Sequence, residues 1–382
     1  MANVTAGWLI VIGDFTPLGG MDCANWALAR YLARSGQVDL VAHRVWPDLV
    51  ALPNIKVHKV WRPLGKHLLG EPLLDRAGQS WAKELSKSGA RVLVNGGNCR
   101  WFDVNWVHYV HAAYKSPTPN RFARRLKAVA YHKRSLARER YVIPRSRTVV
   151  CNSHLTANHV VEKLGVSPGR VKVVYYGCDL TRFPAITPSE RRQARQELGW
   201  AERPWAVFVG AMGDARKGFD TLYTAWRELC RKPSWDANLA VVGRGAEVLT
   251  WQAQAQVDGL ADRIHFLGFR DDVPRILAAA DLMVHPARYE AYGLGVQEAL
   301  CRGLPVLVSA SAGVAERYPT DLHDLLLTDP DNAAELADKL QTWRDNIDTW
   351  PHRLASFAAA LRSHTWDDMA KEFVAAVGTG ES

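Results

Sequence analysis

The stretch from 282 to 309 constrains the fold more than any other part of the chain. It begins with a short apolar run that ends at Pro286, and proline cannot continue the hydrogen bonds of a strand. After a glycine-containing loop, residues 294–302 place apolar side chains at helical spacing, and Gly303 ends that helix as a C-cap. Residues 306–308 begin another buried strand. The stretch therefore predicts one strand-loop-helix-strand unit of an open parallel sheet.

Two carboxylates flank the start of the expected helix. Ligands of such sheets bind beyond the carboxyl ends of the strands, where the loop with Glu290 lies. Glu298 falls in the first turns of the helix, where unbonded backbone N–H groups carry the positive end of the helix dipole. Carboxylates accept hydrogen bonds from hydroxyls, and the amides can hold phosphate oxygens. The pattern suits a ligand with hydroxyls at two places and phosphates between them; the alternative is two solvated glutamates.

The segment resembles the nucleotide-sugar signature of glycosyltransferase family 4, a retaining family with the GT-B fold. The match consists of Glu290, seven further residues, Glu298-Ala299 and then Gly303-Leu304-Pro305-Val306. The resemblance implies that Glu290 is a catalytic-site residue that holds hydroxyls of the donor sugar, and that Glu298 holds the ribose hydroxyls. It also implies that the sugar and the diphosphate meet the backbone of Ala291, Tyr292, Gly293 and Leu294.

A chain of 382 residues is long enough for two domains that each bury a core. The resemblance extends over nearly the whole chain and implies an α/β GT-B architecture, in which two Rossmann-like domains face a central cleft. We expect an acceptor-binding domain at 1–180, to which a C-terminal helix at about 364–382 crosses back, and a nucleotide-sugar-binding domain at 181–363. Residues 176–179 stand where the family usually has Asn-Gly-Val-Asp, which places the linker near 178–185.

The cysteines and the first residues bear on location. Six scattered cysteines without close pairs argue against a disulfide framework or a zinc ribbon and indicate a reducing compartment. The chain starts without the basic region of a signal peptide, and "WLIVIG" is typical of a first strand. No run of 18 apolar residues occurs, so we expect no membrane span. These features predict a cytoplasmic protein.

The net charge of +9 is unevenly distributed. Residues 1–180 hold 26 Lys and Arg against 11 Asp and Glu, whereas residues 181–382 hold 22 against 28. Much of the excess lies in a basic helix expected at 121–140. An anionic membrane surface attracts basic residues by about 1 kcal/mol each, so this helix predicts peripheral docking to the inner face of the membrane. The alternative is a solvated helix on its own domain. Nucleic acid is not expected, because no recognition motif or aromatic platform occurs.

The first domain offers a glycine pair at a strand-to-helix junction. Residues 8–13 predict a strand and residues 23–35 a helix, and Gly19-Gly20 lies between them. Glycine lets a backbone approach a phosphate closely. In this position the pair also resembles the glycine loop of the family's first domain, so Gly19 and Gly20 are predicted donor-binding residues.

Two histidines follow another apolar run. His108 and His111 come at the carboxyl end of a predicted strand, where an imidazole can carry a proton or bind a sugar hydroxyl. For His108, a purely structural role within the domain is an equal alternative. The position of His111 resembles the family's cleft histidine, which touches the donor sugar or the acceptor, so His111 is a predicted catalytic residue.

The second domain opens with a strand, a glycine-rich loop and a helix. Lys217-Gly218 in this loop matches the family's phosphate-binding Lys-Gly, so Lys217 is predicted to bind the donor and to act in catalysis. Many relatives carry an arginine directly after the glycine that ends this strand, where this chain has Ala211. We expect Arg216 to compensate for that missing cation.

Further donor contacts are expected at Gly243, and at Phe269 and Arg270 in the loop that resembles the family's nucleobase cradle. Asp271-Asp272 and residues 329–331 are acidic enough to suggest a metal site. Both adjoin helix starts, where aspartate commonly caps the N-terminus, so we expect caps, and neither a metal nor a cofactor.

The resemblance predicts a retaining, metal-independent transfer of a hexose-type sugar from a nucleotide-diphosphate sugar. A carbohydrate, a lipid-linked sugar or a phosphorylated molecule would be the acceptor, as in polysaccharide or glycolipid biosynthesis. The alternatives are a nucleotide-sugar epimerase or phosphorylase on the same fold, and a non-catalytic module that binds sugar nucleotides.

Overall fold

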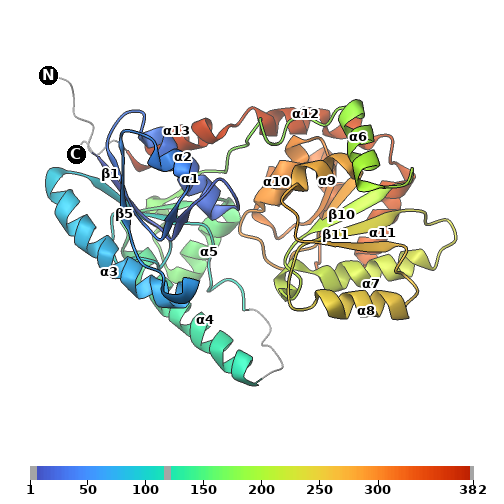
Figure 1. Cartoon of the computed structure of the whole chain (residues 1–382), viewed down its shortest axis with the longest axis horizontal. Helices are drawn as coiled ribbons and strands as arrows, with labels where there is room; N and C mark the ends of the chain where they lie inside the picture. The colour runs from blue at the N-terminus through green and yellow to red at the C-terminus, as the bar shows by residue number, and fades with distance from the viewer. Residues whose placement is uncertain (1–6, 116–121, 379–382) are drawn as a thin grey trace. The chain divides into compact units, whose positions relative to one another are not determined.

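The computed structural model describes residues 7–115 and 122–378, without the side chains of residues 122–128. The chain divides into two compact units, which are coloured along the sequence in Figure 1. The first unit combines Met1–Gly177 with Thr365–Ser382, and the second is Cys178–His364. The expected domain boundaries differ from these limits by a few residues. Each unit is described by itself.

The first unit is built on a seven-stranded sheet in the order β5-β3-β1-β6-β7-β8-β9, in which all paired strands are parallel. Most of its strands are apolar runs that are buried along their length, as expected for a parallel sheet covered on both faces. The strands are β1 (Trp8–Val11), β3 (Val38–Ala42), β5 (Ile55–Lys59), β6 (Arg91–Val94), β7 (Val104–Val107), β8 (Thr148–Cys151) and β9 (Val171–Val173). Two short strands, β2 (Asp14–Phe15) and β4 (Arg44–Val45), pair beside it.

The α-helices that the structure describes in the first unit are α1 (Met21–Leu32), α2 (Pro47–Val50), α3 (His67–Leu85), α4 (Phe122–Val142), α5 (His154–Leu164) and α13 (Trp366–Val377). The last of these, α13, packs on α1 and the sheet. Phe373 lies 4.7 Å from Trp106, measured between ring centroids, and Asp367 pairs with Arg34 at 2.6 Å. The helix expected at the end of the chain is therefore part of the first unit (Figure 1).

The second unit contains a six-stranded parallel sheet in the order β12-β11-β10-β13-β14-β15. The strands are β10 (Trp205–Val209), β11 (Asn238–Val242), β12 (Ile264–Gly268), β13 (Leu282–His285), β14 (Val306–Ser309) and β15 (Leu326–Leu327). The helices are α6 (Pro188–Leu198), α7 (Phe219–Cys230), α8 (Val248–Val257), α9 (Val273–Ala279), α10 (Leu294–Cys301), α11 (Ala333–Asp345) and α12 (Trp350–Arg362). Trp226, Trp343 and Trp350 are among the largest side chains in its core. Both units are thus Rossmann-like α/β domains, as predicted.

Strand order places the ligand-binding edge of each sheet. The first strand of each unit lies inside its sheet: β1 between β3 and β6, and β10 between β11 and β13. The connections on the two sides of such a strand run in opposite directions across the sheet, and this reversal opens a crevice at the carboxyl ends of the neighbouring strands. The residues that follow β1 and β6, and those that follow β10 and β13, are therefore the places to look for chemistry.

The strand-loop-helix-strand prediction for 282–309 is confirmed by β13, α10 and β14. The helix α3 begins at His67 and contains Pro72. The hydrogen bond that a proline removes does not end α3, because the buried face that includes Leu74 and Ala82 holds the helix on the sheet.

The expected aspartate caps of the second unit are only partly present, since Asp272 is at the N-cap position of α9 but Asn332 caps α11. Asp272 precedes α9 but makes no side-chain cap bond, because its carboxylate pairs with Arg270 at 2.5 Å. The cap of α11 is Asn332, whose side chain accepts a hydrogen bond from the amide of Glu335. Asp331 instead pairs with Arg288 at 2.6 Å. Arginine side chains thus engage these carboxylates more strongly than the helix amides do.

The basic segment forms α4, although residue 121 and the side chains of 122–128 lie outside the described residues. Further along this helix, Arg134 and Arg138 face Glu71 at 3.6 and 3.3 Å. Part of the charge of α4 is therefore neutralised within its own unit. None of the described helices has the length and apolar character that crossing a membrane would require.

We predict that Gly243→Ala destabilises the second unit. Gly243 has a φ of 149°, and a Cβ there would lie 1.8 Å from the carbonyl oxygen of Gly210. We expect the free energy of unfolding to fall by at least about 2 kcal/mol, measured by denaturant titration. Gly259→Ala is the control, because Gly259 also has a positive φ (69°) but open space around it. Equal losses in the two variants would contradict the clash.

Candidate functional site

The two loops at the switch point of the second sheet are joined by an ion pair. Lys217 ends a short 3-10 helix, η5 (Ala215–Lys217), after β10, and Glu290 lies in the loop after β13. The Lys217 Nζ donates to Glu290 Oε2 at 2.5 Å. Gly218 makes this approach possible, since a Cβ there would lie 1.9 Å from the carbonyl oxygen of Pro286. The two sequence motifs, 73 residues apart, therefore meet at one point.

A buried histidine supports the same carboxylate. His285 ends β13, and its Nε2 lies 3.2 Å from Glu290 Oε2. Burial lowers the pKa of His285, so the imidazole is neutral. Burial also opposes the ionisation of Glu290, but the Lys217 charge and the His285 hydrogen bond outweigh it and hold the pKa of Glu290 well below its usual range. Glu290 is thus an ionised acceptor for hydroxyl groups.

The start of α10 offers backbone donors beside this pair. Gly293 is the N-cap in the left-handed region, with a φ of 105°, and its carbonyl accepts from the amides of Val296 and Gln297. The loop before it is fixed by two backbone bonds, from the amide of residue 313 to Glu290 and from the amide of residue 314 to Tyr292. Among the described residues, no hydrogen-bond partner is found for the amides of Gly293, Leu294 and Gly295. These three amides and Lys217 can hold an anion.

Tyr292 contributes backbone rather than its phenol. Its side chain is buried, the hydroxyl pairs with Gln297, and Arg317 Nη1 lies 3.3 Å from that hydroxyl. Burial raises the pKa of Tyr292 to about 12, so the phenol is neutral. The conformation agrees with the expectation that this segment would act through its main chain.

Glu298 lies one turn further along α10 and has an unusual titration. The surroundings of its carboxylate raise the pKa of Glu298 to about 8, chiefly by burial, with Arg182 opposing the shift and Asp179 adding to it. Within the described part of the chain its carboxylate makes no hydrogen bond or ion pair. Glu298 is therefore available to a ligand.

The other residues predicted to bind the donor have different surroundings in the structure. The Arg216 guanidinium pairs with Asp214 at 2.9 Å, and the close contact of Gly243 with Gly210 joins the loops after β11 and β10. Phe269 is exposed, and the guanidinium of Arg244 lies 5.0 Å from its ring centroid. Arg270, in contrast, is held by Asp272. Phe269 thus offers an open aromatic face, and Arg270 does not offer a free cation.

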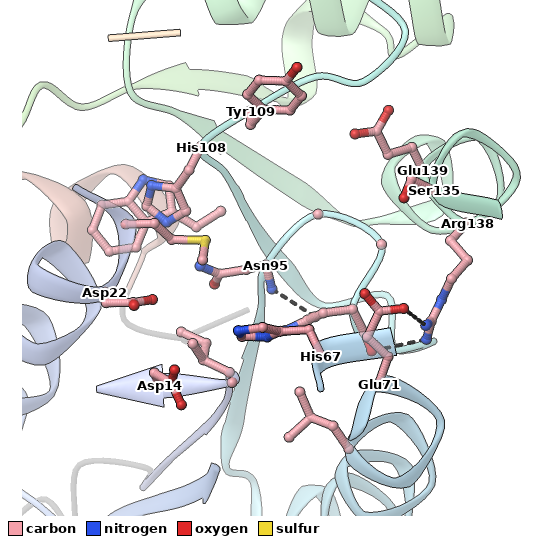
Figure 2. Close-up of a pocket in the computed structure, with 18 of the residues that line it drawn as sticks. Asp14, Asp22, His67, Glu71, Asn95, His108, Tyr109, Ser135, Arg138 and Glu139 are labelled. Carbon is pink, nitrogen blue, oxygen red and sulfur yellow. Dashed lines mark hydrogen bonds and ion pairs between the residues drawn. The ribbon is translucent and has the colours of Figure 1, made fainter. Parts of the chain in front are cut away.

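The first unit has a cavity of about 490 Å³ at the carboxyl ends of β1 and β6 (Figure 2). Gly13 and Asp14 follow β1, and residues 95–98 follow β6, so the strand order alone puts them at the same edge. The wall is completed by side chains of α1, α3, α4 and the segment after β7. The residues used below are Asp14, Asp22, Arg44, Glu71, Asn95, His108, His111, Arg138 and Glu139.

The two predicted histidines have different environments. His108 is buried, with Nδ1 2.5 Å from the Tyr176 hydroxyl and Nε2 3.3 Å from Asn25 Nδ2, and burial lowers the pKa of His108 to about 3. This network favours the structural alternative for His108. His111 is partly exposed, and its Nδ1 lies 2.5 Å from Glu139 Oε1, which also accepts from the His111 amide. No partner for Nε2 occurs among residues the structure describes, so His111 can present that nitrogen to a ligand.

Gly19 and Gly20 are in the loop before α1, and Gly19 has a φ of 84°. They belong to the first unit, and neither lines the cavity. Lys217, Glu290 and Glu298 belong to the second unit. The predicted donor residues are therefore divided between the units, and the donor-binding role of the glycine pair stays a prediction.

Sequence reasoning missed several site residues. Glu139 had a signal, because it is the one acid in the basic segment 121–140. His285 had another, since it ends the strand that leads to Glu290. Asp22 and Asn95 had none, because each matters only through neighbours that the fold brings together.

We predict that Glu298 makes the second unit less stable as pH rises. Between the ordinary pKa of 4.5 and about 8, the folded protein retains a proton that the unfolded chain has lost, so the free energy of unfolding falls across this window. Glu298→Gln removes this titration, and the melting temperature of the variant should rise relative to the wild type from pH 5 to pH 8.5. The control is Glu202→Gln, which changes a largely exposed side chain. Parallel pH profiles for wild type and Glu298→Gln would contradict the prediction.

Comparison with known proteins agrees with this geometry. Residues 18–182 match the model described as Glycosyltransferase Family 4, and residues 203–346 match that described as Glycosyl transferases group 1. The D-inositol 3-phosphate glycosyltransferase of Salinispora tropica is 28% identical over 347 residues, which cover 83% of this chain and 72% of that protein. The corresponding protein of Salinispora arenicola is 32% identical, over 51% of this chain and 46% of its own length.

Solved structures show the same fold. WaaG, a glycosyltransferase involved in lipopolysaccharide biosynthesis, has a TM-score of 0.71 at 22% identity, over 97% of this chain and 95% of that chain. Anabaena Alr3699/HepE, solved in complex with UDP and glucose, has a TM-score of 0.69 at 19% identity, over 97% and 98% of the two chains. These likenesses confirm the predicted GT-B fold. With both of its units matched by the family's models, the chain belongs to the group 1 glycosyltransferases, in the retaining family 4.

Proposed function

We propose that this glycosyltransferase moves a hexose-type sugar from a nucleotide-diphosphate sugar, held by the second unit, to a carbohydrate acceptor that enters the cavity of the first. The observation that carries the proposal is the Lys217–Glu290 pair beside the three unbonded amides of α10. This arrangement provides a cation and backbone donors for phosphates and an ionised carboxylate for sugar hydroxyls. A nucleotide sugar has both kinds of group next to each other.

The donor is activated by electrostatics in this proposal. When the glycosidic bond to the diphosphate breaks, negative charge grows on the departing phosphate oxygens, and donors already in place stabilise that charge. Lys217 shares its ammonium between Glu290 and the phosphate, and the helix amides supply further donors. One cation at about 4 Å contributes ~4 kcal/mol at an effective dielectric of 20. The proposed mechanism uses no metal or cofactor.

Three residues have narrower proposed roles on the donor. Glu290 orients the sugar through its hydroxyls, and Glu298 accepts from the ribose hydroxyls. Arg216, which pairs with Asp214, is the proposed replacement for the arginine that many relatives carry where this chain has Ala211. For Arg216 to act, a diphosphate must compete with a carboxylate, and the double charge of the diphosphate favours this exchange.

On the acceptor side, His111 directs its unbonded ring nitrogen at an acceptor or sugar hydroxyl, and Glu139 fixes the orientation of the ring. The relatives are named for action on inositol 3-phosphate and on lipopolysaccharide, which supports a carbohydrate-like acceptor. A lipid-linked acceptor would explain the basic charge of α4, through docking on an anionic membrane surface of the cytoplasm. We do not propose nucleic acid as a partner.

We predict that Lys217→Ala lowers kcat/KM for sugar transfer by about 10³-fold, because ~4 kcal/mol of stabilisation of the leaving diphosphate is lost. First, a thermal-shift panel of UDP, GDP, ADP and their sugars identifies the donor. Transfer or donor hydrolysis is then followed by NMR, which also shows whether the first product keeps the anomeric configuration. Lys232→Ala, an exposed lysine of the same unit, is the control. Unchanged turnover in Lys217→Ala would reject the phosphate role.

The same assay distinguishes the alternatives. An epimerase would change the configuration of the sugar without an acceptor, and a binding module would bind the nucleotide sugar without cleaving it. Retention of configuration together with a new glycosidic bond is expected only of the proposed enzyme.

We predict that Glu139→Gln lowers kcat/KM about tenfold or more, since the loss of a hydrogen bond to a charged group costs ~1.5–3 kcal/mol and frees the ring of His111 to rotate. The substitution keeps the size of the side chain, and circular dichroism checks the fold. Glu84→Gln removes an exposed acid of the first unit and serves as control. If both variants retained full activity, Glu139 would have no positioning role.

A further inference from the structure

The cavity of the first unit differs in charge from the half of the chain that contains it. Residues 1–180 have an excess of Lys and Arg, 26 against 11 acidic residues. The cavity lining has the opposite balance, with four carboxylates and two guanidinium groups: Asp14, Asp22, Glu71 and Glu139 against Arg44 and Arg138. The positive charge of this unit is therefore not gathered around the cavity.

The cations of the lining are already engaged. Arg44 lies 3.4 Å from Asp14, which also pairs with Arg62 at 2.5 Å. Arg138 lies 3.3 Å from both Glu71 and Asp75. A phosphate that entered the cavity would compete with these carboxylates for either guanidinium. It would also meet the remaining acids at close range, where like charges repel.

Asp22 is the carboxylate without a fixed partner. It extends from the first turn of α1 into the cavity, and within the described residues it forms no hydrogen bond or ion pair. Burial, followed by the charge of Asp14, raises the pKa of Asp22 to about 6, against the pull of Arg44 and Arg62. At pH 7.5 it is thus a half-buried anion that no cation of the described residues pairs with directly. A ligand ammonium or hydroxyl is the natural partner for such a group.

Asn95 is the second and independent sign of a ligand. It is 7% exposed, and neither Nδ2 nor Oδ1 has a hydrogen-bond partner in the part of the chain that the structure describes. Figure 2 shows Asn95 among the residues that line the cavity. Its backbone N–H donates to Asn98 Oδ1, which fixes the loop but leaves the side-chain amide unbonded. Leaving a buried donor and acceptor unbonded is costly and rare. A sugar hydroxyl, which both donates and accepts, satisfies such an amide.

We propose that this cavity recognises an uncharged or amine-bearing sugar or cyclitol ring through Asp22 and Asn95, and that it discriminates against phosphorylated rings. The inference rests on the proposed function, which makes the cavity the acceptor site. It narrows the acceptor classes expected from the sequence, because it removes phosphate from the part of the acceptor that enters the cavity. A volume near 490 Å³ is in the range of about 300–1,000 Å³ that small-molecule sites have.

The test compares three probes that share one ring: glucose, glucosamine and glucose 6-phosphate. Binding to the full chain at pH 7.5 is measured by saturation-transfer NMR, with a saturating nucleoside diphosphate present. We expect glucosamine to bind at least about fivefold more tightly than glucose, as one partly exposed ion pair provides, and glucose 6-phosphate to bind more weakly than glucose. Tighter binding of the phosphate, or binding of none of the three, would overturn the inference.

A substitution locates the effect. Asp22→Asn keeps the shape of the side chain, and it should remove the advantage of glucosamine over glucose. Glu84→Gln, which takes the same charge from an exposed site of the unit, should preserve that advantage. An unchanged advantage in Asp22→Asn would contradict the role of Asp22. If that variant does not fold, the ranking of the probes on the unmodified chain still decides.

Failure of the inference and failure of the proposed function give different results. A nucleoside diphosphate that raises the melting temperature while the phosphorylated probe binds best leaves the proposed function intact and rejects the acceptor class. If no nucleoside diphosphate or nucleotide sugar binds, both are rejected.

Discussion

The contact between the Lys217 ammonium and the Glu290 carboxylate is the interaction on which the second unit's chemistry depends. It joins the loops that follow two neighbouring strands, β10 and β13, and keeps the carboxylate ionised in a place where burial alone would neutralise it. Two glycines of these loops, Gly218 and Gly293, adopt left-handed backbone conformations that let the loops come together. The approach of these two loops therefore determines both the charge of the site and the conformation of its backbone.

The two units apply the same topology to opposite tasks. In each unit the first long strand, β1 or β10, lies inside the sheet, and the residues that follow it lie beside those that follow a neighbouring strand. The second unit puts a lysine and helix amides there, which suits an anion. The first unit puts Asp14, Asp22 and Asn95 there, which suits hydroxyls or a cation. The net positive charge of the first unit therefore does not extend to its cavity, because arginines such as Arg138 pair with carboxylates of the same unit.

The sequence predicted what depends on local pattern. The unit β13-α10-β14 followed from the spacing of apolar residues, a proline and a glycine. The final helix, expected at about 364–382 from the resemblance, is found at Trp366–Val377. The Lys217-Gly218 motif was recognisable because it matches a family pattern of two adjacent residues. Asp22 and Asn95 were not recognisable, since a carboxylate in a helix or an amide after a strand acquires meaning only from the element that packs beside it. The expected aspartate caps fail for another reason, because arginines bind these carboxylates: Arg270 lies two residues before Asp272, and Arg288 lies 43 residues before Asp331.

Two successive residues of α4 serve two different parts of the first unit. Glu139 fixes the imidazole of His111, while Arg138 bonds to Glu71 and Asp75 on α3. A shift or rotation of this helix therefore changes both the wall of the cavity and the direction of the ring. If the cavity selects the acceptor and His111 acts in the transfer, as we propose, both properties depend on the position of α4, and variants that widen the range of accepted molecules by moving α4 will also turn over more slowly.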